Sequence, residues 1–321
     1  MSDDEVNAAF QPLWSDINQV DTFPAKRPLL AHYTSIAVLE SIMSKDEIWF
    51  SNPLYMNDLE ELRFVILEGA SAFRRHEQIR GACGSSEKYA VLRDAFEYYF
   101  NKFSNEHALD TYVFCFSEHD SANTDGLLSM WRGYGGNGNG AALVVDTEQF
   151  GEIAGSPLIL SNVTYASTEE RLSWIERKLQ EFAELVKSNV IPKDKLFIAA
   201  YQLFERFKIF ALFTKHRGFS EEREWRVIYL RDRDANGLLD GMLHYAVGSR
   251  GIEPKLKLKV KPIEGVSRPD LSLETIVAHI ILGPTVSTPV AVSSVRRMLE
   301  KLAKAQLAQR VIASTTPYRP Q

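Results

Sequence analysis

Residues 29–61 read LLAHYTSIAVLESIMSKDEIWFSNPLYMNDLEE, and the predicted fold is organised around this stretch. An apolar start leads into a histidine, a tyrosine and a threonine at 32–34, and the β-branched and aromatic residues here favour a strand. A short amphipathic helix at 36–43, with Thr34 or Ser35 as its cap, and a second strand at 48–50 follow. The stretch then runs into turn-forming residues. It therefore predicts a strand-helix-strand-loop unit with polar side chains at its ends, where sites usually lie.

The composition indicates a globular protein of moderate acidity. The chain has 321 residues, 45% of them hydrophobic, and 37 basic against 42 acidic residues give a formal net charge of -5. This balance argues against a broad surface for coating nucleic acid but leaves a local basic groove possible. The two cysteines, Cys83 and Cys115, form no CxxC pair, which predicts a reduced protein without disulfides. The acidic start and the lack of an apolar run of about 18 residues predict a cytoplasmic protein outside the membrane.

The remaining periodicities predict an α+β fold with a mixed or split β-sheet and several helical insertions. Apolar residues at helical spacing predict an amphipathic helix from Val6 to Ile17, so residues 1–28 are interpreted as a helical extension. Residues 29–321 contain no convincing linker and are expected to form a single domain. The segment 196–213 is apolar nearly all round, which predicts a central buried helix. Thr288 and Pro289 are expected to start a late helix.

A charged segment precedes and enters one of the predicted strands. From Arg223 the sequence alternates as a strand should, so Glu222, Glu224 and Arg226 are expected to project from the same side. Such a cluster is either a functional site or a solvated strand face with a salt bridge.

A glycine-rich loop comes before another predicted strand. Gly133, Gly135 and Gly138 satisfy GxGxxG by letter, but a helix precedes them and a strand follows, which is the reverse of the dinucleotide fingerprint. The glycines are therefore expected to form a turn that allows close backbone approach.

Several short motifs follow one another along the chain in a definite order. They are His32-Tyr33-Thr34, Asn57-Asp58 with Glu60, Phe116-Ser117, Met130-Trp131 with Tyr134, Glu222-x-Glu224-x-Arg226, the run from Ile280 to Pro284, Ser314, and Pro317-Tyr318-Arg319. Over residues 29–319 this ordered set resembles a widespread bacterial family of unknown function. That family in turn resembles the ADP-ribosyltransferase superfamily, including DNA-modifying toxin transferases with a comparable H-x-T.

The resemblance implies an ADP-ribosyltransferase-like split sheet that binds NAD as a substrate in a cleft, without a metal. It implies catalytic roles for Glu224, Glu222 and His32. Cleaving the bond between nicotinamide and ribose develops positive charge on the sugar, which a fixed carboxylate stabilises. Glu224 is the first choice for that carboxylate, and Glu222 is the first choice for activating or orienting the acceptor. The opposite assignment of these two roles stays open.

The resemblance also implies which residues contact the dinucleotide. The expected NAD-binding residues are His32, Tyr33, Thr34, Asn57, Asp58, Trp131, Tyr134 and Arg226. His32 and Thr34 would hold the adenosine side, the three aromatic residues would offer a ring face, and Arg226 would bind the pyrophosphate. Several of them have a structural alternative. His32 could be a satisfied histidine at a strand end, residues 57–58 a helix cap, Trp131 a core residue, and Arg226 an arginine that only neutralises the glutamates.

The predicted function is therefore NAD-dependent transfer of ADP-ribose to nucleic acid or protein. The resemblance implies a toxin or phage-defence effector with a regulatory or antitoxin protein as a further partner. The alternatives are an NAD glycohydrolase, which uses water as acceptor, and a non-catalytic domain that senses a nucleotide or binds a protein. No HExxH, paired CxxC or P-loop is present, so the motifs support neither zinc nor nucleoside-triphosphate chemistry.

Overall fold

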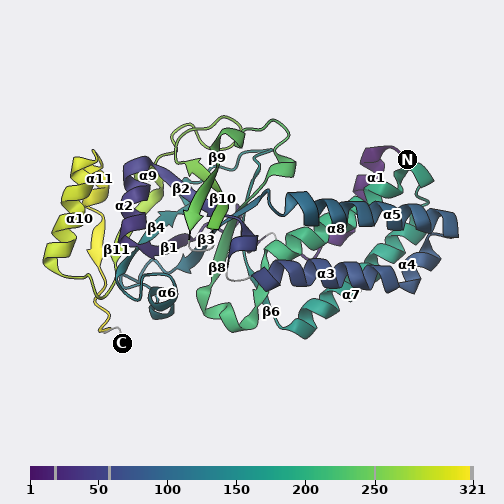
Figure 1. Cartoon of the computed structure of the whole chain (residues 1–321), viewed down its shortest axis with the longest axis horizontal. Coiled ribbons are helices and arrows are strands. Elements are labelled where there is room, and N and C mark those ends of the chain that lie inside the picture. Colours follow the sequence, from purple (N-terminus) through teal and green to yellow (C-terminus); the bar gives the residue numbers. More distant parts are fainter. Residues whose placement is uncertain (18–19, 57–58, 249–250, 319–321) are drawn as a thin grey trace. The chain divides into compact units, whose positions relative to one another are not determined.

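A computed structural model describes residues 1–17, 20–56, 59–248 and 251–318 of the chain. The chain forms two compact units from interleaved segments (Figure 1). The helical unit consists of Met1–Gln19, Pro53–Asp110 and Val163–Phe219. The sheet unit consists of Val20–Asn52, Thr111–Asn162 and Ser220–Gln321.

The sheet unit contains most of the strands. They are β1 (Leu29–Ser35), β2 (Glu47–Ser51), β3 (Thr111–His119), β4 (Gly140–Asp146), β5 (Leu158–Asn162), β8 (Glu224–Leu230), β9 (Leu243–Gly248), β10 (Gly251–Lys259), β11 (Val277–Leu282) and β12 (Val311–Ala313). Its helices are α2 (Ile36–Lys45), α6 (Leu128–Gly133), α9 (Leu273–Ile276), α10 (Pro289–Lys301) and α11 (Ala305–Ala308).

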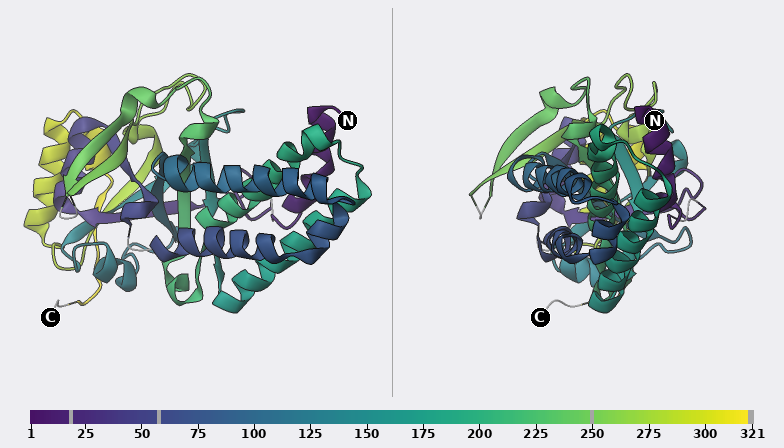
Figure 2. Two further views of the ribbon diagram at one scale, coloured as in Figure 1. Left: turned by 45° about the vertical axis from the view of Figure 1, so that its right-hand side comes forward. Right: turned by 90° about the vertical axis from the view of Figure 1, so that its right-hand side faces the viewer.

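These strands form one mixed sheet in the described part of the chain. The main order is β12-β11-β4-β1-β3-β2-β10-β9, and β8 pairs with β3 and carries β5 on its other edge. Strands β11 and β12 run parallel, and the other pairs in this sheet are antiparallel. Strands β9 and β10 form a long hairpin, drawn in green, that extends outward from the sheet (Figure 2).

The two faces of this sheet are covered differently. Face A carries Leu30, Leu143, Phe114 and Trp225 in a large apolar core, against which α2, α9, α10 and α11 pack. Face B carries a smaller core in which Trp131 of α6 packs with apolar residues of β1, β4 and β11. Because successive residues of a strand point to opposite faces, β1, β4 and β11 contribute to both cores.

The helical unit contains helices of different lengths that lie alongside one another (Figure 1). They are α1 (Asp3–Ala9), α3 (Leu59–Arg75), α4 (Glu77–Ala82), α5 (Ser86–Lys102), α7 (Thr168–Ser188) and α8 (Leu196–Leu212), and the short strands β6 (Thr164–Ala166) and β7 (Thr214–His216) pair in parallel. Phe73, Phe96 and Phe204 stack or meet edge to face in the core. As predicted, α8 is buried along most of its circumference.

One aspartate joins three segments of the helical unit. Asp16 accepts a hydrogen bond from the Trp174 indole at 2.8 Å and pairs with the buried cations of Arg206 at 2.9 Å and Lys178 at 3.0 Å. Burial opposes ionisation of Asp16, but the bonds and charges of Trp174, Arg206 and Lys178 outweigh it and lower its pKa. The carboxylate therefore fixes the N-terminal segment to α7 and α8.

The α+β class with a mixed sheet and helical insertions is confirmed, and the ADP-ribosyltransferase-like form of the sheet stays a prediction. The division into 1–28 and 29–321 also stays a prediction. The two compact units have other boundaries, because segments of the helical unit are inserted between strands of the sheet unit. The expected helix from Val6 to Ile17 is too long. It ends at Ala9, and a 3-10 turn over Gln11–Trp14 follows, because Pro12 has no N–H to continue the helix.

The first inserted segment leaves and re-enters the sheet at neighbouring points. The side-chain Nδ2 of Asn52, just after β2, donates to the carbonyl of Thr111 at the start of β3 over 2.9 Å. Asn52 is fully buried. The two ends of the inserted segment 53–110 are therefore held together inside the sheet unit.

Replacing Asp16 by Asn should destabilise the protein in a pH-dependent way. Removing the charge leaves two buried cations less well paired, and we expect a loss of about 3 kcal/mol in unfolding free energy near neutral pH. Because the folded pKa is lowered, the stabilisation is present above the ordinary value of 3.8 and is lost as the pH falls through the folded pKa. Urea denaturation at about pH 7 and about pH 3 measures this difference.

The exposed Asp94, replaced by Asn, is the matched control and should change little at either pH. An Asp16→Asn effect equal to the control, or independent of pH, would contradict this account of the network.

Candidate functional site

Along one of its edges, strand β3 pairs first with β2 and then with β1, so the sheet forks at β3. This fork positions the candidate site. On one edge β3 pairs continuously with β8, from Thr111↔Leu230 to Ser117↔Glu224. On the other edge it pairs with β2 at Val113 and with β1 at Ser117. The sheet therefore divides at β3, with β1 leading to β4 and β11 and β2 leading to β10 and β9.

His32 of β1 lies at this fork. Its Nδ1 is 2.9 Å from the carbonyl oxygen of Cys115, which lies between the two pairing regions of β3. The ring stacks on Phe114 with centroids 4.3 Å apart. Burial lowers the pKa of His32, and the bond to Cys115 offsets this only in part. Because a carbonyl only accepts, the neutral imidazole carries its proton on Nδ1 and donates it to Cys115.

The charged pair predicted on β8 is present and buried. The Arg226 guanidinium donates from Nε to Glu224 Oε1 at 2.8 Å and from a terminal nitrogen to Oε2 at 3.1 Å. Glu224 and Arg226 are 5% and 6% exposed. Such a two-pronged bond fixes the plane of the carboxylate. Ser117, the cross-strand partner of Glu224, is 1% exposed, and its Oγ has no hydrogen-bond partner among the described residues.

Glu222 lies outside the strand on which it was expected. It ends a 3-10 turn over Arg217–Glu222, and Arg223 then has a φ of +45° before β8 starts at Glu224. This left-handed residue interrupts the extended backbone, so strand alternation does not relate Glu222 to Glu224. The Tyr134 hydroxyl donates to Glu222 Oε1 at 2.8 Å, and Tyr134 is 46% exposed.

These residues define what we call the Glu224 cluster: Ser117, Tyr134, Glu222, Glu224 and Arg226. Exposure increases from the buried side chains of Ser117, Glu224 and Arg226 to the more accessible Glu222 and Tyr134. The cluster thus combines a fixed buried carboxylate with a second carboxylate nearer the solvent. This is an arrangement that can stabilise positive charge and orient a nucleophile.

His32 and Glu224 project from opposite faces of the sheet. Ala31 pairs with Ser117, and Ser117 pairs with Glu224, so these three side chains share face B. His32 follows Ala31 in the same strand and therefore lies on face A, where it stacks on Phe114. The structure does not bring the two predicted catalytic side chains together, because the register puts them on different faces.

Two of the predicted aromatic contacts are packed into the core of face B. Tyr33 and Trp131 meet edge to face with centroids 4.8 Å apart and are 5% and 0% exposed. The Tyr33 hydroxyl accepts from the amide of Leu127 at 2.8 Å, and the Trp131 indole donates to the carbonyl of Asp125 at 2.8 Å. Their rings are used in packing, so Tyr134 is the one of the three that offers an accessible ring.

The remaining predicted contacts are distributed elsewhere. Thr34 is 8% exposed and lies on face A with His32. Asn57 and Asp58 lie outside the described residues.

The glycine-rich loop is a close-approach turn, as expected. Helix α6 precedes it and β4 follows. Gly138 has a φ of +84°, and a Cβ on Gly140 would lie 2.1 Å from the Thr34 carbonyl oxygen.

Sequence reasoning did not identify two features of face B. Ser117 is part of a sequence motif but had no predicted role, and only the cross-strand register places it beside Glu224. His119 and His279 lie with ring centroids 5.4 Å apart, and the Nε2 atoms of both have no hydrogen-bond partner within the described ranges. Burial lowers the pKa of both rings. They are far apart in sequence, and no spacing motif connects them.

Within the part of the chain that the structure describes, no group of three or more His, Cys, Asp or Glu side chains is placed to hold a metal ion. None of the helices in the described ranges combines the length and apolar character that crossing a bilayer requires.

Comparison with known proteins gives one family match. Residues 130–227 match a family model described as "Protein of unknown function (DUF2971)". The matched region starts within α6 and ends in β8, so it contains Tyr134, Glu222, Glu224 and Arg226. No curated protein and no solved structure matches the chain. The expected likeness to a family of unknown function is thus supported over this region, and the relation to ADP-ribosyltransferases stays a prediction.

Replacing His32 should destabilise the sheet according to whether the new side chain can still donate to Cys115. His32→Ala removes the imidazole that donates to the Cys115 carbonyl at the fork, and we expect a loss of about 1 to 3 kcal/mol in unfolding free energy. His32→Asn can place an amide donor near the Nδ1 position and should retain part of that stability. Urea denaturation of both variants, with the exposed His244→Ala as control, measures the difference.

If Asn and Ala at position 32 are equally destabilising, the hydrogen bond to Cys115 is not the stabilising contact. If both behave like His244→Ala, the fork does not depend on His32.

Proposed function

We propose that the protein is an NAD-dependent ADP-ribosyltransferase in which Glu224 is the reacting-site carboxylate and nucleic acid or protein is the acceptor. The observation that carries the proposal is the geometry of Glu224. Its carboxylate is buried, is held in one plane by Arg226, and has the Ser117 hydroxyl on the neighbouring strand. A fixed, poorly solvated carboxylate is well suited to stabilise positive charge that develops on a ribose ring.

In the proposed step, the bond between ribose C1′ and the nicotinamide nitrogen breaks, and nicotinamide leaves as a neutral molecule. A nucleophilic oxygen or nitrogen of the acceptor forms the new bond to C1′ and transfers its proton to Glu222. Glu224 stabilises the oxocarbenium-like ribose between these events, as carboxylates do in glycoside hydrolysis. The more accessible side of the cluster, at Glu222 and Tyr134, is where a macromolecular acceptor would approach.

Compared with the residue roles expected from the sequence, this proposal omits His32. Its ring donates to Cys115 and lies on face A, whereas the Glu224 cluster lies on face B. The proposed site therefore consists of Glu224, Glu222, Arg226, Ser117 and Tyr134. Its chemistry does not depend on a contact between His32 and Glu224.

The Glu224→Gln substitution should reduce release of nicotinamide from NAD by about 100-fold to 1,000-fold, the range for removing one group that stabilises transition-state charge. Glutamine keeps the size of the side chain and removes its charge. The measurement is nicotinamide release by purified protein, with and without cell lysate as a source of acceptors. Glu148→Gln, an exposed glutamate in the same unit, is the matched control and should behave as the parent protein does.

Release that requires lysate supports transfer, whereas release without lysate identifies water as the acceptor and favours the glycohydrolase. No release from the parent protein in either condition, together with no binding of NAD in calorimetry, would refute the proposal. Thermal unfolding of Glu224→Gln separates lost chemistry from lost folding.

Ser117→Ala should reduce NAD turnover without reducing stability. The Ser117 Oγ has no partner among the described residues, so its removal breaks no described hydrogen bond. If this hydroxyl contacts the bound ribose, kcat/KM should fall about 10-fold, which corresponds to roughly 1.4 kcal/mol. Parallel measurements of nicotinamide release and melting temperature test this. Unchanged turnover would remove Ser117 from the site, and a lower melting temperature would assign it a packing role.

A further inference from the structure

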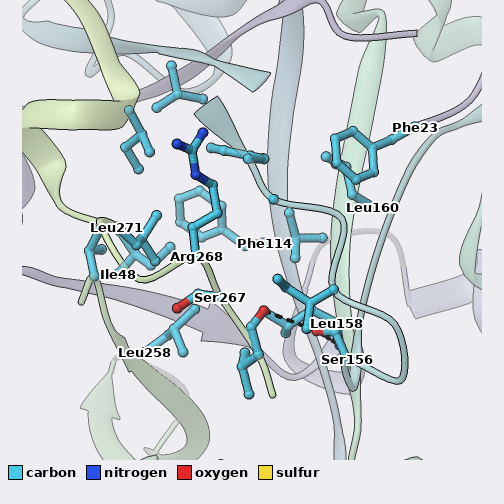
Figure 3. Close-up of a pocket in the computed structure, with 18 of the residues that line it drawn as sticks. Phe23, Ile48, Phe114, Ser156, Leu158, Leu160, Leu258, Ser267, Arg268 and Leu271 are labelled. Atoms are coloured by element: carbon cyan, nitrogen blue, oxygen red, sulfur yellow. Dashed lines mark hydrogen bonds between the residues drawn. The ribbon is translucent and has the colours of Figure 1, made fainter. Parts of the chain in front are cut away.

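A cavity of about 340 Å³ lies within the sheet unit on face A (Figure 3). Its floor is formed by β3, β4, β5 and β8, with Phe114, Phe116, Leu143, Leu160 and Val227 among the lining residues. Segments 150–156 and 266–273 contribute further walls. Figure 3 shows Phe23 and Leu160 on one side of the cavity and Ile48, Leu258 and Leu271 on the other.

The lining is almost entirely hydrocarbon. Phenylalanine, leucine, isoleucine and valine side chains make up most of the wall. Ser156 and Ser267 also line it, but their hydroxyls are already used: Ser156 Oγ donates to the carbonyl of Val266, and Ser267 Oγ donates to that of Lys261. A water molecule held inside needs about two to four polar partners, which this wall does not offer.

The guanidinium of Arg268, which also lines the cavity, is already paired with a carboxylate. Arg268 donates from Nε and a terminal nitrogen to the two carboxylate oxygens of Asp270, at 3.0 Å and 2.9 Å. Its other terminal nitrogen donates to the carbonyl of Gln149 at 3.3 Å. Asp270 thus neutralises the Arg268 charge. The cavity presents a hydrophobic rather than a cationic surface to a ligand.

The size of the cavity exceeds what side-chain packing normally leaves. Protein cores are packed as densely as organic crystals, and voids larger than a water molecule are few. By contrast, sites for small ligands begin at roughly 300 Å³ and are lined mainly by apolar and aromatic side chains. The exposed Glu152 and the 34% exposed Arg268 side chain mark the side of the cavity that faces solvent.

We propose that this cavity is a binding site for an uncharged, hydrocarbon-like small molecule, such as a medium-length aliphatic chain without an ionised headgroup. Nothing in the proposed NAD chemistry requires such a ligand. Phe116 and Val227 line the cavity, whereas their chain neighbours Ser117 and Arg226 belong to the Glu224 cluster on the opposite face. The two sites are therefore separated by the sheet, and either can exist without the other.

The test uses the neutral fluorophore N-phenyl-1-naphthylamine as probe on the full-length protein. We expect saturable binding to one site. Leu160→Trp, which fills part of the cavity from β5, should weaken the binding at least 10-fold. Leu158→Phe is a second, smaller filling change in case the first impairs folding, and melting temperatures verify both. Ile252→Trp, an aliphatic-to-tryptophan change at an exposed position of β10, is the matched control and should leave the affinity unchanged.

Displacement of the probe tests the chemical class of the ligand. Because Arg268 is paired with Asp270, 1-decanol should displace the probe at lower concentration than decanoate does. Stronger displacement by decanoate would overturn the uncharged class. Absence of saturable binding, or equal affinities in the parent protein and in folded Leu160→Trp and Leu158→Phe variants, would overturn the site itself.

Discussion

The fork in the sheet is bridged by the hydrogen bond from the His32 side chain to the carbonyl of Cys115. In the middle of β3 the pairing on one edge passes from β2 to β1, and the partly buried Cys115 lies between the two pairing regions. At this point a side chain of β1, rather than a strand backbone, donates to the carbonyl of β3. The strand-helix-strand unit β1-α2-β2 then places its two strands on different branches. The fork explains why a histidine occupies this position without any reference to a substrate.

The register at this fork also separates the two faces chemically. On face A, the aromatic residues of β3 extend a hydrocarbon surface from the His32 ring to the cavity. On face B, the same strand places Ser117 beside the ion pair of Glu224 and Arg226. A buried ion pair is weak grounds for stability, since desolvation of two charges offsets much of their attraction. For this reason we assign the pair to the proposed chemistry rather than to stability.

Sequence patterns were reliable where a local rule applied. Alternation predicted β8 from its charged and aromatic residues, the reversed context excluded a dinucleotide fingerprint at the glycine loop, and Thr288 caps α10 as expected. What the patterns did not reveal depended on residues far apart in the sequence. The opposite faces of His32 and Glu224 follow from how β1 and β8 both register with β3, which no spacing in the sequence reveals. Similarly, the left-handed Arg223 separates Glu222 from Glu224 although the letters alternate without interruption.

Because segments of the two units alternate along the chain, the two units are completed at different times during synthesis. The last segment of the helical unit ends at Phe219, whereas the sheet unit needs β8 to β12, which are synthesised later. Domains generally fold as units as the chain emerges during synthesis. The helical unit can thus complete its core while β2, β3 and β4, which are already made, still lack their later partners β10, β8 and β11. The hydrogen bond between Asn52 and Thr111 would then secure the first two parts of the sheet unit during this interval.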